Sequence, residues 1–207
     1  FLIGGRAEQV LFFVMLSILI FQVLNKQRIK SMLAIFIIIP LISFTSYQTS
    51  NLFKQRVDLA YAEIAGFSEQ KSMNTSIGLR INFAINSFEV IKKNPFFGVG
   101  TGDFPLEYSK VNQINSPSYL TTSNPHNMYT LVSSQLGIFG LVSLLSIFYF
   151  QIKFSFSSSN KFLRDAGVTL PIMFLVMMLS DAYLLGHYTS LMFVFFSSFL
   201  YKDFEKL

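Results

Sequence analysis

MYTLVSSQLGIFGLVSLLSIFYFQI, residues 128–152, is the stretch that decides the fold class. It contains no charged residue, and at about 1.5 Å per residue it is long enough to cross the bilayer as a helix. The rest of the chain follows the same trend, because 52% of its 207 residues are hydrophobic and only 13% are charged. A water-soluble domain of this size could not bury so much apolar surface. The sequence therefore predicts an all-α integral membrane protein and excludes a soluble enzyme, a disordered chain and, with no cysteine, a disulfide scaffold.

Four further apolar stretches lie on either side of this one, at residues 7–24, 31–47, 166–185 and 187–201. Together the five stretches predict about five transmembrane helices. Pro40 lies inside the second stretch and is expected to kink it, because proline removes a helix hydrogen bond. No basic segment precedes the first stretch, so it does not resemble a signal peptide.

The charges of the linkers predict the orientation. Residues 25–30, 153–165 and 202–207 lie on one side of the membrane if the spans alternate, and they carry the entire net charge of +5. The positive-inside rule makes this side cytoplasmic and the opposite side periplasmic. The basic character therefore reflects topology, and no pattern of a nucleic-acid-binding protein is present.

Three regions follow from this topology: residues 1–50 as two transmembrane helices, 51–125 as a large, mostly helical periplasmic loop, and 126–207 as three transmembrane helices. The loop contains an expected amphipathic helix at residues 76–93, which Asn94 and Pro95 end. We expect this helix to lie on the membrane surface or to pack over the spans. Its apolar face consists of Ile77, Ile81, Ala84, Ile85, Phe88 and Ile91.

Glycine occupies three alternate positions just after this helix, at Gly98, Gly100 and Gly102. Glycine tolerates positive φ, so these amides could form a nest for an anion, or the segment could be a flexible turn. No strand precedes the glycines and no helix directly follows them, so neither a Rossmann fold nor a P-loop is indicated.

Arg6, Arg80 and His126 are all predicted at the periplasmic membrane surface. Each has a structural explanation by itself: Arg6 as a snorkelling residue, Arg80 at the edge of an amphipathic face, and His126 as an interfacial histidine. Together they suggest chemistry, because two guanidinium groups can bind a diphosphate. A neutral imidazole beside them can accept a proton from an attacking hydroxyl.

Asp181 and His187 are secondary candidates, because they flank the turn between the last two spans. His126 and His187 are the only histidines in the chain. No carboxylate-rich metal site is evident in the sequence, so we expect no metal and no cofactor.

Four motifs in this order resemble the O-antigen ligase and polymerase superfamily: TSIGLR at residues 75–80, NPFFGVGTGDF at 94–104, NPHNMY at 124–129 and QLGIFGL at 135–141. The resemblance covers about residues 6–145. It implies a GT-C-like glycosyltransferase architecture with about a dozen spans and a large periplasmic loop in the C-terminal half. The 207 residues are then expected to be that half of a longer protein.

The resemblance also implies a metal-independent, inverting transfer of a glycan from undecaprenyl pyrophosphate, at the periplasmic face of the bacterial inner membrane. His126 would activate the acceptor hydroxyl, and Arg80 and Arg6 would hold the pyrophosphate. Gly98, Gly100, Gly102 and Asn127 are possible loop contacts. The partners would be the lipid-linked donor, lipid A–core as acceptor, and membrane lipid, with no nucleic acid.

The NPHN and QLGIFGL motifs favour a ligase, but the same architecture serves other acceptors. A polymerase would join lipid-linked repeat units, and a pilin-type ligase would transfer the glycan to a protein. A transporter of the same lipid would use the arginines without chemistry, and should show internal repeats that this sequence lacks. A non-catalytic membrane scaffold would need neither His126 nor Arg80.

Overall fold

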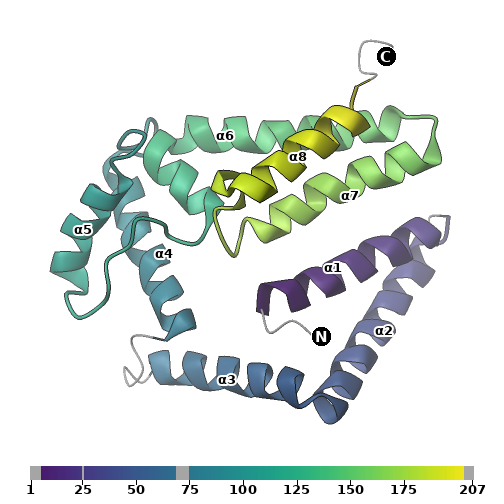
Figure 1. Ribbon diagram of the computed structural model, residues 1–207, viewed down its shortest axis with the longest axis horizontal. Coiled ribbons are helices and arrows are strands. Elements are labelled where there is room, and N and C mark those ends of the chain that lie inside the picture. Colours follow the sequence, from purple (N-terminus) through teal and green to yellow (C-terminus); the bar gives the residue numbers. More distant parts are fainter. Residues whose placement is uncertain (1–5, 25, 69–74, 203–207) are drawn as a thin grey trace. The chain divides into compact units, whose positions relative to one another are not determined.

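The computed structural model describes residues 6–24, 26–68 and 75–202, and all regular structure within them is helical (Figure 1). The predicted all-α fold is confirmed for this part of the chain. The helices are α1 Arg6–Val23, α2 Arg28–Thr49, α3 Asn51–Ser68, α4 Ser76–Lys93, α5 Phe104–Asn115, α6 Met128–Ser157, α7 Lys161–Met177, the 3-10 helix η1 Tyr183–Leu185, and α8 His187–Leu200.

The chain divides into two compact units, residues 1–65 and 66–207. In the first unit α1 packs against α2 across a short turn. The hydroxyl of Ser31, which is fully buried, donates to the carbonyls of Leu24 and Gln27, each at 3.2 Å. Both carbonyls also accept backbone amides, that of Leu24 from Gln27 at 2.8 Å and that of Gln27 from Ser31 at 2.9 Å, so the hydroxyl adds a further bond across the turn.

Two of the described helices, α2 and α6, are long and apolar enough to cross a membrane, while α1 and α8 are apolar but shorter. The arrangement of five spans stays a prediction. The predicted span at residues 166–185 differs in extent, because α7 ends at Met177. The chain then turns, and the carbonyl of Met178 accepts a hydrogen bond from the amide of Met128 at 2.9 Å.

The second unit is built around α6, which packs against α7, while α4 and α5 cover its N-terminal part. Helix α8 packs on α7, where the rings of Phe174 and Phe193 lie 4.8 Å apart. The buried core consists of Phe83, Phe104, Tyr108, Met128, Leu131, Leu144, Phe148, Phe174, Met178 and Ala182. This core joins the loop helices to the apolar helices, so the polar turn between them has a fixed geometry.

Helix α4 has the predicted bounds. The Thr75 side chain accepts from the Gly78 amide at 3.2 Å, a helix cap that the sequence analysis had not singled out. The packing face differs from the expectation, because the buried residues include Asn82 and Asn86, whereas Phe88 on the predicted apolar face is 56% exposed. Helix α4 therefore does not pack its apolar face against the other helices of this unit.

The polar face of α4 is buried against α5, which begins two positions after Gly102, so the expectation that no helix directly follows the three glycines is wrong. The Asn86 amide donates to Asn112 at 3.0 Å and to the hydroxyl of Ser116 at 2.7 Å. The Asn82 amide donates to Asn112 at 3.4 Å, and the hydroxyl of the fully buried Tyr108 lies within the same network. Buried polar groups are stable when they are paired, so these side-chain amides add to the apolar contact between the two helices, in which the Phe83 and Tyr108 rings lie 6.0 Å apart.

Candidate functional site

The segment that enters α6 holds His126 in an unusual conformation. His126 has φ 52°, and it is the one non-glycine residue with positive φ in the described ranges. The Asn124 side chain accepts from the His126 amide at 2.9 Å, which forms a local turn. A left-handed residue of this type costs on the order of 1 kcal/mol or more, so the surrounding contacts must hold it.

Asp181 faces the imidazole from the turn after α7. Its Oδ2 lies 3.3 Å from the buried Nδ1 of His126, at ion-pair distance although without the alignment of a hydrogen bond. The carboxylate is itself fixed, because Oδ1 accepts from the Ala182 amide at 2.7 Å and from the Asn124 side-chain amide at 3.0 Å. Asn124 therefore holds both members of the pair, one through each end of its amide.

Burial alone would raise the pKa of Asp181. The hydrogen bond from the Ala182 amide, the neighbouring His126 ring and the Asn124 amide together outweigh burial, so the pKa of the carboxyl lies below its usual value. The group is therefore a carboxylate at neutral pH. Its side chain is 38% exposed and that of His126 is 37% exposed, so the pair is reached from outside the protein.

The ring of Phe83 packs against the other side of this arrangement. It stacks on the His126 ring with centroids 6.0 Å apart and an angle of 23° between the planes. Phe83 lies on the buried face of α4, and Arg80, which is exposed, precedes it by one turn, or about 4.5 Å along the axis. The predicted convergence of Arg80 with His126 stays a prediction, because the observed contact of α4 with the imidazole is made by Phe83.

Side-chain hydrogen bonds join the start of α6 to the end of α7 and the turn that follows it. The Asn127 side chain caps α6 by accepting from the Thr130 amide at 3.0 Å, and it donates to the carbonyl of Leu179 at 3.1 Å. The hydroxyl of Tyr129 donates to the carbonyl of Leu175 at 2.6 Å. Asn127, a predicted loop contact, thus positions the turn that carries Asp181.

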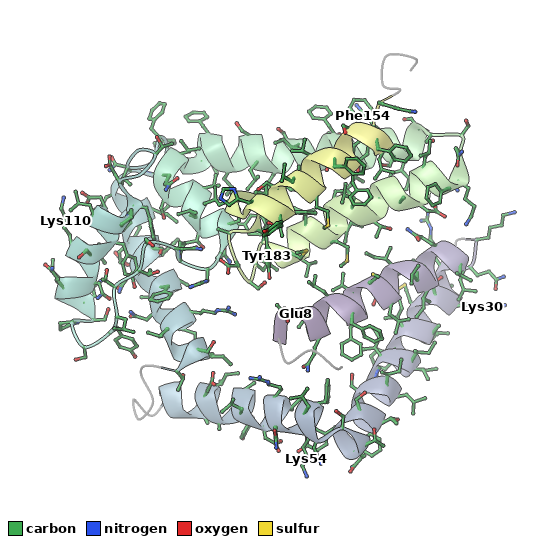
Figure 2. All side chains as sticks on the ribbon, viewed as in Figure 1. Glu8, Lys30, Lys54, Lys110, Phe154 and Tyr183 are labelled. Atoms are coloured by element: carbon green, nitrogen blue, oxygen red, sulfur yellow. The ribbon has the colours of Figure 1, made fainter. Side chains whose placement is uncertain are left out.

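A cleft of about 450 Å³ opens beside the carboxylate, between the turn after α7 and the start of α8. Tyr183, labelled in Figure 2, lies in this turn, and His187 begins α8. The structure thus joins Asp181 to His126 and places His187 in the adjoining cleft. The lining residues are Asn124, Asp181, Ala182, Tyr183, Leu185, Gly186, His187, Tyr188 and Thr189.

The three loop glycines all have positive φ, as expected: 71° for Gly98, 108° for Gly100 and 94° for Gly102. Their role differs from that of an open nest. The amide of Gly98 donates to the carbonyl of Asn94 at 2.9 Å, and that of Gly100 to the carbonyl of Gln135 at 3.0 Å. These two amides are used within the chain and are not directed toward an anion.

Arg6 is the first residue of α1 and belongs to the other unit, and its side chain lies outside the described residues. Its predicted convergence with Arg80 and His126 stays a prediction. In the described ranges, no group of three or more His, Cys, Asp or Glu side chains is arranged to hold a metal ion.

Sequence reasoning ranked Asp181 behind the arginines and missed Asn124 and Phe83 as neighbours of His126. Asn124 and Asp181 are 57 positions apart, so no local pattern links them. The Asn-Pro-His-Asn order was the available signal, because an asparagine side chain commonly accepts a hydrogen bond from the backbone two residues further on.

Fold and site together define a class: an all-helical, membrane-associated protein in which a His–Asp pair lies in the polar segments that join apolar helices. The chain belongs to the O-antigen ligase family, whose sequence profile it matches over residues 1–145. It is also similar to an uncharacterized protein of Haemophilus influenzae, with 28% identity over 160 residues. That match covers 71% of this chain and 39% of the Haemophilus influenzae protein, so the chain spans about two fifths of that relative.

Proposed function

We propose that this chain is part of an O-antigen ligase-type glycosyltransferase, which moves a glycan from undecaprenyl pyrophosphate onto a hydroxyl of lipid A–core. The reaction takes place at the periplasmic face of the bacterial inner membrane. The observation that carries the proposal is the His126–Asp181 pair, in a chain of the O-antigen ligase family. Strained residues cluster at functional sites, and a histidine paired with a carboxylate supplies the general base that glycan transfer requires and lipid transport does not.

His126 acts as the general base. With Nδ1 protonated and turned toward Asp181, Nε2 keeps its lone pair for the acceptor hydroxyl. As Nε2 takes the proton, the acceptor oxygen attacks the anomeric carbon and the bond from that carbon to the pyrophosphate oxygen breaks. The bonding electrons leave with the pyrophosphate, and the configuration at the sugar inverts.

Asp181 is a positioning residue that acts through His126. Its carboxylate keeps the imidazole in the required tautomer and stabilises the imidazolium that forms as the proton is taken up. The low pKa of Asp181 suits this role, because the carboxylate stays charged and does not take the proton from the ring. The contact is 3.3 Å without substrate, and such contacts commonly shorten in the reacting complex.

Arg80, together with Arg6, holds the pyrophosphate and stabilises the charge that collects on it. A guanidinium donates two parallel hydrogen bonds to phosphate oxygens, which suits a diphosphate better than an ammonium does. The support for this role is that Arg80 is exposed and lies on α4, the helix whose Phe83 ring stacks on His126.

The proposal is tested by complementation with the full-length gene in a strain that lacks its own O-antigen ligase, read on a lipopolysaccharide gel. We expect long-chain lipopolysaccharide with the unaltered protein and none with His126→Ala, at equal membrane levels. Gln113→Ala, at an exposed position of α5, is the matched control and should ligate normally.

Ligation by His126→Ala at the normal level would overturn the assignment of the base. Failure of the unaltered protein to ligate, followed by longer repeat-unit chains in a polymerase-null strain, would instead assign the polymerase reaction. Glycan transfer by the purified protein separates either enzyme from a transporter.

A further inference from the structure

Helix α6 is broken at Gly137, and the loop after α4 fills the break. Gly137 has φ 65° and ψ −160°, and the first turns of α6 run at an angle to the remainder (Figure 1). The amides of Val99 and Gly100 donate to the carbonyls of Ser134 and Gln135, at 2.9 and 3.0 Å. In the opposite direction, the amide of Ile138 donates to the carbonyl of Pro95 at 2.9 Å. We call the segment Pro95–Gly100 the stitch loop.

The stitch loop and the break meet backbone to backbone. A Cβ atom at Gly98 would lie 2.2 Å from the carbonyl carbon of Gln135, and one at Gly137 would lie 2.2 Å from that of Phe96. Both contacts are far below van der Waals distance, so only glycine fits at each position. The two glycine motifs of the sequence are therefore the two halves of one structural element.

This element pairs backbone groups that a helix break would otherwise leave without partners inside a membrane. An unpaired backbone carbonyl in hydrocarbon costs several kcal/mol, so a broken helix is tolerated there only when its freed groups are paired. The stitch loop supplies two donors and one acceptor to α6 at the break. The break can therefore lie at the edge of the hydrocarbon region.

The length of α6 indicates which part of the helix crosses the membrane. Residues 138–157, after the break, are about 30 Å long at 1.5 Å per residue, close to the thickness of the hydrocarbon core, and Lys153 lies in the last turns, where its long side chain can reach the cytoplasmic interface. This part is long enough to span the membrane without the turns that precede Gly137. The break then coincides with one boundary of the hydrocarbon, and the stitch loop lies at that boundary.

The side chains of the stitch loop suit this location. Phe96 is 61% exposed and Phe97 is 77% exposed, and the Phe97 ring lies 5.3 Å from that of Phe139, itself 57% exposed on α6. The aromatic surface is thus continuous with the exposed apolar surface of the spanning part. Lys92, which pairs with Glu89 at 2.7 Å, and the exposed Lys93 lie within three positions of the loop, and the charge of Lys93 suits the level of lipid phosphates.

We infer that Phe96 and Phe97 contact phospholipid at the boundary between acyl chains and headgroups, so that the stitch loop fixes the depth of the candidate site relative to the bilayer. The occupant of this surface is lipid, not another protein segment. The inference rests on membrane insertion of α6 and is independent of the reaction proposed above.

Depth is measured with a nitroxide label on a single introduced cysteine, in the full-length protein reconstituted in phosphatidylcholine and phosphatidylglycerol vesicles. The 207 residues contain no cysteine, so each substitution adds one defined site in this chain. The test position is Phe97→Cys. Val142→Cys, 57% exposed in the spanning part, is the hydrocarbon reference, and Gln113→Cys in α5 is the water reference.

We expect oxygen, which partitions into lipid, to relax the label at position 97 more than the same label at Gln113, and less than that at Val142. A water-soluble nickel complex should show the reverse order. Relaxation at position 97 that equals the water reference would overturn the inference. Protection from both reagents would also overturn it, because another protein segment would then cover the surface. Phe139→Cys repeats the measurement if a label at position 97 prevents insertion.

Discussion

Asn124 donates from its side-chain amide to Oδ1 of Asp181 at 3.0 Å, and its own Oδ1 accepts from the His126 amide. One side chain thus ties the strained histidine to the carboxylate that faces it. This hydrogen bond joins the segment before α6 to the turn after α7. The two residues are 57 positions apart in the sequence. The bond makes the His126–Asp181 pair a property of the fold rather than of either segment.

Replacement of the carboxylate tests the pair directly. Asp181→Asn should lower the rate of glycan transfer by on the order of 10²–10⁴, because the histidine loses the group that selects its tautomer. Transfer by the purified protein should fall in kcat with little change in the KM for the acceptor. The control is Asp165→Asn, which removes a carboxylate that pairs with Lys161 far from His126 in the chain. Equal losses in both variants would contradict the positioning role.

Stability in acid should depend on Asp181. The pKa of this carboxyl is lower in the folded protein than in the unfolded chain, so the carboxylate stabilises the fold above the usual Asp pKa of about 3.9. This contribution is lost as the pH falls through the lower folded-state value. The difference in Tm between the unaltered protein and Asp181→Asn should therefore be present at pH 7 and shrink below about pH 4. A difference that grows in acid would contradict the assigned direction.

Arg80 should act in transfer and not in folding. Arg80→Ala should reduce transfer by on the order of 10²–10³, the usual effect of removing one preorganised charge partner. Arg80→Lys should restore only part of the rate, because an ammonium lacks the paired donors of a guanidinium. Tm should change little, since Arg80 is exposed on α4. Lys93→Ala, at an exposed position of the same helix, is the control for charge alone.

The stitch loop predicts unequal effects for two glycines that share positive φ. Gly137→Ala places a methyl group against the backbone at Phe96, whereas Gly102→Ala has φ 94° but no atom within 4 Å of the new Cβ. Both variants incur the conformational cost, on the order of 1 kcal/mol. Only Gly137→Ala also forces the loop out of the break, so its Tm in detergent should fall clearly further. Similar Tm values would contradict the close approach.

The amide network between α4 and α5 should be sensitive to loss of a single side chain. Asn86 is 1% exposed and donates to both Asn112 and Ser116, so Asn86→Ala removes two buried hydrogen bonds, leaves a cavity in their place and should cost about 1–3 kcal/mol. Thermal unfolding monitored by circular dichroism measures the change. Asn115→Ala, at an exposed position of α5, should be close to neutral.

The bounds of α4 show what local sequence can determine. Lys93 is followed by Asn94 and Pro95, and proline disfavours helix in the residue before it, so residues 76–93 were predicted as the helix that the structure contains. The class of fold was equally accessible, because composition alone shows that the apolar surface exceeds what a soluble core could bury. The bounds of α4 depend on interactions within a few residues, and the class of fold depends on the amino-acid composition of the whole chain.

The site depended on tertiary structure. Helix α4 buries its asparagines because α5 offers matching amides and a hydroxyl, and no periodicity of α4 alone records that partner. Helix α6 breaks at Gly137 because residues 95–100 supply the hydrogen bonds that the break gives up. Asp181 faces His126 because α7 ends at Met177 and its last turns are bonded to the start of α6. The sequence by itself thus determined helices and membrane character through short-range and summed effects. The site, by contrast, consists of polar groups that are distant in the sequence. Only the packing of the chain determined which donor meets which acceptor.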